Sequence, residues 1–295
     1  MSKPKKITAP ALRAMKGSSR IGMITAYDFP SARIADAAGA DVILVGDSLG
    51  MVVLGYPDTL SVTVDDMLHH TRAAARGVKQ SLLVGDMPYL SYHVSIEESV
   101  RNAGKFIQAG AHAVKVEGAK PSRIKTIEAI LDAEVPVMGH IGLTPQSVNA
   151  LGGFKLQGKN ADDARRMIDE AVALEQAGCF SIVLECVPTE LAALITDRVA
   201  IPTIGIGAGP HCDGQVLVFH DLLGLYEGHT PKFVRRYANI GDEMQAAISA
   251  YLADVREGTF PSEVSESFHM ASDEELKRLY ATRDDGGVVV EMPRG

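Results

Sequence analysis

The sequence has no tryptophan and only three cysteines among its 295 residues. Cys179, Cys186 and Cys212 form no C-x-x-C pair, which excludes a zinc ribbon and a thioredoxin-like redox motif. We therefore expect the three cysteines to act as small buried hydrophobic residues of a protein in a reducing cytosol.

Positive charge is also scarce. The 29 lysines and arginines are outnumbered by 37 aspartates and glutamates, so that the formal net charge is −8. A surface of this sign does not attract a phosphate backbone. The eight phenylalanines and eight tyrosines also offer few rings on which bases could stack. We therefore expect no nucleic-acid partner.

Long apolar runs are missing as well. No stretch approaches the roughly 18 uncharged apolar residues of a transmembrane helix, so we expect no membrane partner. The N-terminus reads MSKPKKITAPALRAMKG, which is basic but lacks the apolar run of a signal peptide. No zinc-type HExxH pattern and no G-K-[ST] phosphate loop occurs. These absences predict a cytoplasmic protein.

The chain does contain short apolar runs that alternate with longer, charged, helix-like segments. With 46% hydrophobic and 22% charged residues, it can bury a large core. The run interiors are continuously apolar, as in parallel strands covered on both faces. The eight runs lie at residues 21–28, 41–47, 81–88, 113–118, 136–142, 181–186, 202–209 and 216–225. This pattern fits a (β/α)8 barrel or a doubly wound sheet, and eight strands favour the barrel.

Six helices are predicted between these strands, and one link is too short for a helix. The helices are expected at residues 29–38, 63–78, 95–109, 121–133, 161–177 and 189–199. Between 202–209 and 216–225 only six residues remain, so either the seventh helix is reduced to a turn or one strand is misplaced. After the last strand, residues 231–256 read as a long amphipathic helix. We predict one barrel domain over residues 1–271 and a weakly ordered tail over 272–295.

The residues that close the apolar runs are the candidates for chemistry, because barrel active sites lie at the carboxyl ends of the strands. A single acid there is more often a helix cap, but five acids around one mouth must bind a cation or share protons. The closing residues are Asp28, Asp47, Asp86, Glu117, His140, Glu185, the glycines of 205–209 and the pair His220-Asp221.

The ligand types at this mouth favour magnesium. Carboxylates without cysteine, and with few histidines, suit Mg²⁺, which leaves positions for water and substrate. Lys115 lies two residues before Glu117 and adds one cation. A metal, a lysine and a spare carboxylate base fit enolate chemistry on a 2-oxo acid. The glycines of 205–209 fit close backbone packing better than a phosphate loop, because they do not match G-x-G-x-x-G.

Long stretches around these residues resemble the ketopantoate hydroxymethyltransferase family. The likeness covers roughly residues 5–268, nearly the whole chain. The matching stretches read ITAYDFPSARIADAAGAD, ILVGDSLGMVVLGYPDTLSVTVDDMLHHTRA, GAHAVKVEG, GHIGLTPQSVNALGGFKLQGK, and IPTIGIGAG followed by CDGQVLVFHDLLGL. The residues from about Ser272 onward match nothing in the family.

The resemblance implies a TIM barrel of the phosphoenolpyruvate mutase/isocitrate lyase superfamily, assembled as a homodecamer. It also implies that 5,10-methylenetetrahydrofolate donates a hydroxymethyl group to 3-methyl-2-oxobutanoate, giving 2-dehydropantoate in pantothenate and coenzyme A synthesis. By the same resemblance Asp47 and Asp86 bind Mg²⁺, and Glu117 belongs to the metal site. Asp47, Ser48, Asp86 and Lys115 would hold the 2-oxo acid, Glu185 would accept the proton, and His140 is a secondary candidate.

Two other functions remain to be distinguished. One is another Mg²⁺-dependent carbon–carbon enzyme of the same superfamily, such as a 2-oxo acid aldolase or an oxaloacetate-type lyase, which we would expect to lack GHIGLTPQ and DTLSVTVDDM. The other is an inactive barrel that serves as a metabolite sensor or scaffold. The complete set of acids argues against the second, because a cluster of buried charges is costly to a protein that does not use it.

Overall fold

A computed structural model describes residues 6–225, residue 228 and residues 230–281. The internal contacts divide the chain into two compact units, Met1–Asn239 and Ile240–Gly295. Each unit is considered by itself.

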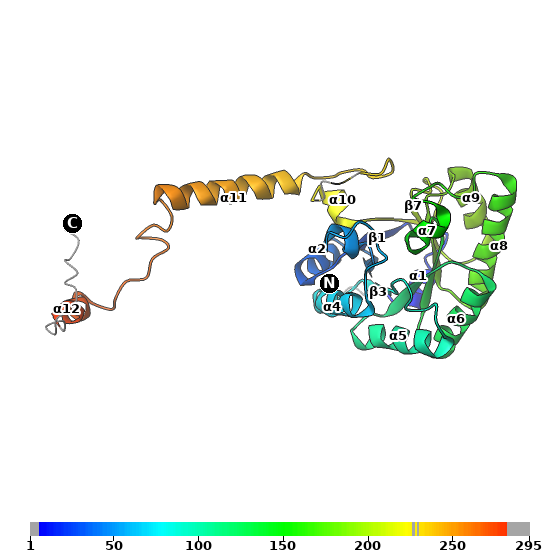
Figure 1. Cartoon of the computed structure of the whole chain (residues 1–295), viewed down its shortest axis with the longest axis horizontal. Coiled ribbons are helices and arrows are strands. Elements are labelled where there is room, and N and C mark those ends of the chain that lie inside the picture. Colours follow the sequence, from blue (N-terminus) through cyan, green and yellow to red (C-terminus); the bar gives the residue numbers. More distant parts are fainter. Residues whose placement is uncertain (1–5, 226–227, 229, 282–295) are drawn as a thin grey trace. The chain divides into compact units, whose positions relative to one another are not determined.

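The first unit is a closed barrel of eight parallel strands (Figure 1). Each strand pairs with its neighbours in sequence, and β1 pairs with β8, so that Ile21 lies opposite Gly214 and the ring has no free edge. This closure confirms the barrel and excludes the doubly wound sheet. The strands are β1 Ile21–Thr25, β2 Val42–Val45, β3 Leu82–Asp86, β4 Ala113–Glu117, β5 Val137–Gly142, β6 Ser181–Glu185, β7 Thr203–Ile206 and β8 Gly214–Leu217.

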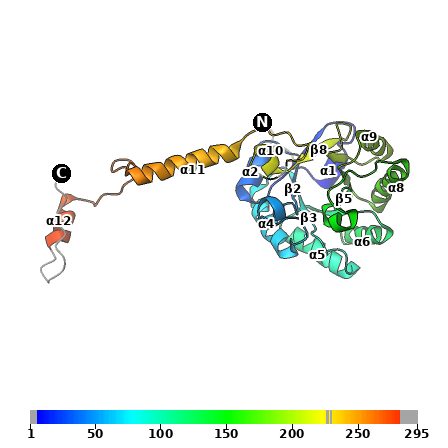
Figure 2. The same cartoon turned by 45° about the horizontal axis from the view of Figure 1, so that its top comes forward.

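Helices surround this ring, and the six predicted between the strands are present (Figure 2). Thr63, Ser95 and Asn160 begin three of them, each accepting a hydrogen bond from the backbone N–H three residues on. The surrounding helices are α2 Phe29–Ala37, α4 Val64–Gly77, α5 Ile96–Gln108, α6 Pro121–Asp132, α8 Ala161–Ala177 and α9 Thr189–Arg198. Shorter ones are α1 Ala9–Arg13, α3 Leu49–Val52, the 3₁₀ turn Pro145–Ser147, α7 Val148–Leu151 and α10 Phe219–Leu223.

The end of the barrel differs from the sequence prediction. The strand predicted at residues 216–225 is β8, which ends at Leu217, and α10 follows it. A continuous apolar run does not distinguish a buried strand from a short helix, so the periodicity could not locate this change. No helix connects β7 to β8, and the seventh helix is thus reduced to a turn. The long helix predicted from residue 231 begins at Ile240.

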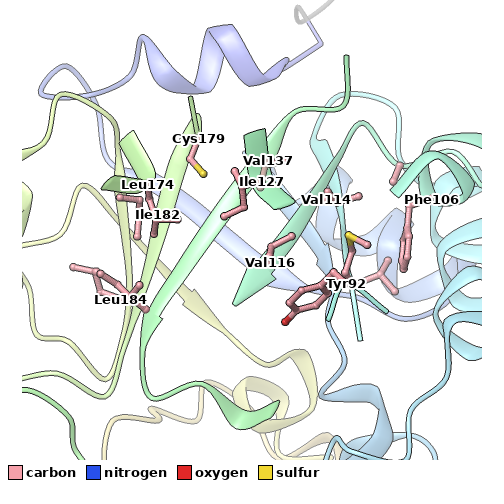
Figure 3. Packing of buried hydrophobic residues seen from close by; sticks show 14 of the residues in the cluster. Tyr92, Phe106, Val114, Val116, Ile127, Val137, Leu174, Cys179, Ile182 and Leu184 are labelled. Carbon is pink, nitrogen blue, oxygen red and sulfur yellow. The ribbon is translucent and has the colours of Figure 1, made fainter. Parts of the chain in front are cut away.

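Two apolar layers hold the barrel together. One lies inside the ring, where alternate strand residues such as Val42, Leu44, Leu82 and Val84 pack with Leu12 of α1. The other lies between the strands and the helices. Figure 3 shows part of it, with Val114, Val116, Val137, Ile182 and Leu184 from the strands and Phe106, Ile127 and Leu174 from the helices. Successive side chains of a strand point alternately into the ring and out toward the helices, which separates the two layers. The same alternation determines which strand residues face the inside of the barrel.

The second unit contains α11 Ile240–Glu257 and α12 Asp273–Ala281. No residue of α11 is buried. The sequence predicted one domain over 1–271 and a weakly ordered tail from 272, whereas the contacts group α11 with residues 240–295. Within the predicted tail, residues 273–281 are helical, and 282–295 lie outside the described residues. Among the helices described, none is long and apolar enough to cross a membrane.

Candidate functional site

The inner face of the barrel changes from apolar to charged near the carboxyl ends of the strands. In β3 the inward positions run from Leu82 through Val84 to Asp86, and in β4 they run from Ala113 to Lys115 and Glu117. His140 of β5 and Glu185 of β6 follow the inward residues Met138 and Val183 in the same way. Strand periodicity therefore stacks these charges directly on the interior apolar layer.

These charges line a cavity of about 910 Å³. All seven residues assigned to the site by the resemblance contribute to its wall: Asp47, Ser48, Asp86, Lys115, Glu117, His140 and Glu185. Five of them are almost fully buried, with exposures of 1–5% for Asp47, Asp86, Lys115, Glu117 and His140. The fold thus brings together residues from four strands, β3 to β6, and from the loop after β2.

Lys115 is the cation of the cluster. Its Nζ lies 2.8 Å from Oδ1 of Asp86. Burial would lower the pKa of Lys115, but the carboxylates of Asp86, Glu117 and Asp47 outweigh that effect and raise it, so the side chain is an ammonium group. The backbone N–H of Asp47 donates to Oδ2 of Asp86 at 3.2 Å, which ties the loop after β2 to the end of β3.

His140 lies between two glutamates. Its Nδ1 is 3.4 Å from Oε1 of Glu117, and its Nε2 is 3.3 Å from Oε2 of Glu185. Burial and the charge of Lys115 both act to lower the pKa of His140, but the contacts with Glu117 and Glu185 raise it to about 9. Nδ1 also lies 3.3 Å from Nζ of Lys115, so the ring contacts one cation as well as two carboxylates.

Backbone features fix the position of Glu185. The N–H of Leu143 donates to its carbonyl oxygen at 2.8 Å. Gly142 has a φ of 99°, and a Cβ at this position would overlap that carbonyl, so only glycine lets β5 end so close to β6. Cys186, the next residue, has a φ of 47°, a region that few residues other than glycine adopt. Such backbone strain is typical of functional sites.

Three neutral residues that the sequence did not single out, Gln146, Tyr92 and Tyr27, do not line the cavity but hydrogen-bond residues of its wall or one another. The side-chain amide of Gln146 donates to Oδ2 of Asp47 at 2.9 Å, and its backbone N–H donates to Oε2 of Glu117 at 3.2 Å. Tyr92 bonds Gln146 in turn, and Tyr27 bonds Ser48 with 2.9 Å between the two hydroxyl oxygens. Gln146 lies four residues after Gly142, the last residue of β5, but as an uncharged loop residue it carries no local signal of this role.

Ser48 also lies within Gly46–Gly50, which matches the G-x-S-x-G pattern of serine hydrolases and follows a strand. That chemistry needs a base within hydrogen-bond reach of the serine. The hydroxyl of Ser48 instead bonds Tyr27, and His140 contacts Glu117 and Glu185. The geometry gives no reason to assign Ser48 as a nucleophile.

Other strand-closing residues have different roles. Asp28 is the N-cap of α2, where its carboxylate accepts from the backbone N–H of Ser31 at 2.8 Å, and it does not line the cavity. Asp221 does line it, as do Gly207 and Gly209 of the 205–209 run. His220 packs against Tyr27, with 5.5 Å between ring centroids.

Two of the three cysteines match the expectation of buried hydrophobic residues. Cys179 and Cys212 are buried. Cys186 is half-buried and lines the cavity next to Glu185. Burial and the charge of Glu185 raise the pKa of Cys186 to about 12, which keeps its thiol protonated and unreactive.

The donor set fits a magnesium ion. Within the described residues no three His, Cys, Asp or Glu side chains are grouped as a metal site. Mg²⁺ does not require such a group, because it binds through one or two carboxylates and keeps water or substrate on its other positions. Burial raises the pKa of Asp47 and of Asp86, and neighbouring carboxylates raise both further. A divalent cation would remove that repulsion.

The rest of the cavity wall is mainly apolar. Phe154, Leu156 and Phe233 line it together with two lysines, Lys155 and Lys232. Phe154 and Leu156 are 54% and 43% exposed, so this part lies toward the solvent, whereas the charged cluster lies deep in the barrel. The cavity therefore offers a buried anionic end and an open apolar end with positive charge beside it.

Comparisons with known proteins agree with this geometry. The sequence model of the family described as ketopantoate hydroxymethyltransferase matches residues 6–263. A 3-methyl-2-oxobutanoate hydroxymethyltransferase of Syntrophomonas wolfei is 56% identical over 266 residues, which cover 90% of this chain and 95% of the relative. The enzyme of the same name from Clostridium botulinum is 55% identical over 262 residues, covering 88% and 94%.

Solved structures of distant proteins share the fold. A 2,3-dimethylmalate lyase, described as a member of the PEP mutase/isocitrate lyase superfamily, aligns with a TM-score of 0.57 at 17% identity, covering 93% of this chain and 98% of the lyase. A phosphonopyruvate hydrolase in complex with oxalate and Mg²⁺ aligns with a TM-score of 0.55 at 17% identity, covering 94% and 99%. At such identities the likeness establishes the barrel fold alone.

Proposed function

The chain belongs to the ketopantoate hydroxymethyltransferase family, and from this premise we propose that it transfers a hydroxymethyl group from 5,10-methylenetetrahydrofolate to 3-methyl-2-oxobutanoate. The product is 2-dehydropantoate, an intermediate of pantothenate and coenzyme A synthesis. One observation carries the proposal: a single cavity gathers Asp47, Asp86, Lys115, Glu117 and Glu185, the residue types that this reaction needs.

Asp47 and Asp86 would hold Mg²⁺ directly, with Glu117 in its surroundings through water. When bound, the ion would supply positive charge beside the keto oxygen of the substrate, which favours the enolate form. The ammonium group of Lys115 and the hydroxyl of Ser48 would bind the 2-oxo acid. The Mg²⁺ and oxalate of the phosphonopyruvate hydrolase structure support this assignment, because oxalate resembles the enolate of a 2-oxo acid.

Glu185 would accept the proton. The C3–H bond of the substrate breaks, the proton passes to the carboxylate of Glu185, and the electron pair remains on the substrate as an enolate. C3 then forms a bond to the methylene carbon of the folate donor, and both bonds from that carbon to the folate nitrogens break. Water supplies the hydroxyl group of the product, and the two folate nitrogens gain one proton from water and the proton that Glu185 took from C3, which gives tetrahydrofolate. The pKa of His140, raised to about 9, disfavours it as the base, and at 3.3 Å its ring can orient the carboxylate of Glu185. Its role would therefore be positional.

The folate donor would occupy the open end of the cavity. A pterin ring is flat and aromatic, which suits Phe154, Leu156 and Phe233. The glutamate part of the folate carries carboxylates, which Lys155 and Lys232 could bind near the solvent. This arrangement would place the one-carbon unit between the donor and the buried 2-oxo acid.

The test is an assay of the purified protein with Mg²⁺, 5,10-methylenetetrahydrofolate and 3-methyl-2-oxobutanoate. We expect formation of 2-dehydropantoate that depends on all three. Cleavage of a dicarboxylic acid without folate would indicate a lyase of the same superfamily instead. Binding of the 2-oxo acid without turnover would favour a sensor or scaffold. Either result would contradict the proposal.

We also propose a homodecamer in the cytoplasm. The assembly follows the family resemblance and is supported by α11, where Met244, Ile248, Tyr251 and Val255 are 44–56% exposed. These four residues are spaced at three and four positions and so share one face of the helix, and a contiguous exposed apolar face supports an interface there. The three cysteines are all free, as is usual in a reducing compartment. Light scattering coupled to gel filtration would measure the particle mass, and a monomer would contradict this assembly.

A further inference from the structure

Gln146 is a neutral residue that hydrogen-bonds two of the buried acids, Asp47 and Glu117. It lies in the 3₁₀ turn after β5 and is 5% exposed. Its side-chain Nε2 donates to Oδ2 of Asp47 at 2.9 Å and to the carbonyl of Met87 at 2.9 Å. Its backbone N–H donates to Oε2 of Glu117 at 3.2 Å. One residue thus contacts carboxylates that belong to two different strand ends.

A chain of hydrogen bonds fixes the orientation of this amide. The backbone N–H of Glu117 donates to the hydroxyl oxygen of Tyr92 at 3.3 Å, and that hydroxyl donates to Oε1 of Gln146 at 2.5 Å. The two partners of Nε2, the Asp47 carboxylate and the Met87 carbonyl, accept hydrogen bonds. A flipped amide would place its own oxygen against these oxygens and lose both hydrogen bonds. The amide can therefore occupy one orientation.

Tyr92 is itself fixed from outside the barrel. Arg123 of α6 lies over its ring, with the guanidinium carbon 4.2 Å from the ring centroid. The same guanidinium donates to the carbonyl oxygens of Tyr92 and Glu117. Burial raises the pKa of the Tyr92 phenol, so the hydroxyl remains a donor. In the chain from Arg123 to Asp47, each group thus has a fixed role as donor or acceptor. Arg123 donates to the Glu117 carbonyl, the Glu117 N–H to Tyr92, Tyr92 to Gln146, and Gln146 to Asp47.

We propose that Gln146 is a positioning residue that sets the carboxylates of Asp47 and Glu117 for a divalent cation, with Tyr92 fixing its amide. Asp47 needs such support because it lies in the loop after β2, beyond the last ladder pair Val45–Gly85. Hydrogen bonds to metal-binding carboxylates set their direction, and their loss typically weakens metal affinity ~10–100-fold. The inference rests on the Mg²⁺ site of the proposed function.

The experiment is a calorimetric titration of the metal-free full-length protein with MgCl₂. Gln146→Met keeps the length of the side chain and removes its hydrogen bonds, and we expect a Kd for Mg²⁺ ~10–100-fold higher than in the wild type. The control is Gln108→Met on the exposed surface of α5, which should leave the Kd unchanged. An unchanged Kd in Gln146→Met would overturn the inference.

Tyr92→Phe separates positioning from a general loss of structure. It removes one hydroxyl and keeps the ring under Arg123, so we expect a smaller rise in Kd, about 3–10-fold. Groups that act through one another do not have additive effects. Tyr92→Phe should therefore change the Kd little further when Gln146→Met is already present, whereas full additivity would contradict the chain. If Gln146→Met does not fold, Tyr92→Phe decides alone, and an unchanged Kd counts against the inference.

The wild-type titration distinguishes this inference from the proposed function. A wild type that binds no Mg²⁺ overturns both. Suppose that the wild type binds Mg²⁺ and transfers the hydroxymethyl group, and that Gln146→Met has the same Kd for Mg²⁺. This result would overturn only the role of Gln146. A wild type that binds Mg²⁺ without turnover, and loses affinity with Gln146→Met, supports the positioning role and contradicts the transferase.

Discussion

Buried acids lie at both ends of this barrel, but in opposite surroundings. At the amino end, Oδ1 of Asp36 accepts from the backbone N–H groups of Gln80 and Ser81 and from the Ser81 hydroxyl, at 2.8–2.9 Å. Asp213 is 2.8 Å from Nζ of Lys16 and accepts from the N–H of Thr203 at 2.9 Å. At the carboxyl end, Asp47 faces the carboxylates of Asp86 and Glu117, and Asp86 faces Glu117 as well as its ion-pair partner Lys115.

The pKa shifts express this difference. Burial alone would raise the pKa of Asp36, but its hydrogen bonds lower it. Burial and the carboxylates of Asp86 and Glu117 raise the pKa of Asp47, and burial raises the pKa of Asp86 in spite of its ion pair with Lys115. Asp36 is therefore stabilised as an anion by the fold, whereas the acids of the cavity are held together against their repulsion. The acids at the amino end therefore stabilise the folded barrel. The acids at the carboxyl end destabilise it, as is typical of groups that serve an active site.

The largest effect should follow Glu185→Gln. Glutamine keeps the shape but accepts no proton, and a positioned base typically contributes ~10²–10⁴-fold. We expect a loss of that size in the exchange of the C3 hydrogen of 3-methyl-2-oxobutanoate with deuterium, followed by NMR without folate. Mg²⁺ and substrate should still bind. Exchange at the wild-type rate would show that Glu185 is not the base and would return attention to His140.

Asp86→Asn should weaken Mg²⁺ and the 2-oxo acid together, because the same carboxylate serves both. We expect at least ~10–100-fold weaker metal binding by calorimetry, the range seen for lost supporting groups. Treatment of the wild type with EDTA should abolish turnover, and added Mg²⁺ should restore it. Full activity in metal-free buffer would contradict the metal assignment.

The same substitution at the two ends should change stability in opposite directions. Asp36→Asn should lower the free energy of unfolding by about 1–2 kcal/mol, because it removes the charge from three hydrogen bonds. Asp47→Asn, in metal-free protein at pH 7, should leave it unchanged or raise it, because ionisation of a carboxyl with a raised pKa costs the folded state energy. Urea unfolding of the two variants beside the wild type measures both values.

Acid should remove the effect of Asp36→Asn. The pKa of Asp36 is lower in the folded state than in the unfolded chain, so its contribution is present above about pH 4 and is lost as the pH falls through the folded pKa. Wild type and variant should therefore converge in unfolding free energy below pH 4. A difference that stays constant with pH would mean that the Asp36 charge does not stabilise the barrel.

The smallest effect should follow deletion of residues 273–295. Within the part of this segment that the structure describes, α12 is short and mostly polar. We expect turnover and particle mass, corrected for the shorter chain, to remain within error of the wild type. A truncated protein that dissociates would show that the segment belongs to an interface.

The sequence predicted the barrel because the strand–helix alternation repeats and the strand interiors are continuously apolar. It could not place the change from β8 to α10, since the chain is continuously apolar from Val216 to Phe219, across the boundary between the two elements. It also grouped Asp28 with the other acids at strand ends, although Asp28 caps α2. A capping aspartate and a cavity aspartate occupy the same place after a strand, and only the direction of the side chain differs.

The charged half of the site could be predicted, and the neutral half could not. Asp47, Asp86, Lys115, Glu117 and Glu185 are conspicuous because a charge next to a buried strand has no packing role. Gln146 and Tyr92 are uncharged and lie in loops, where such residues are common. Their importance depends on hydrogen bonds between segments far apart in sequence, which no local pattern encodes.

The closure of the ring through β1 and β8 has a consequence for how the protein folds. The first and last strands must find each other across nearly the whole length of the barrel sequence, and such non-local parallel pairing is slow. Until it forms, water can reach the acids through the open side and screen their repulsion. We therefore expect the proposed Mg²⁺ site to form last during folding. In refolding experiments, the circular dichroism signal of the helices should return well before the affinity for Mg²⁺.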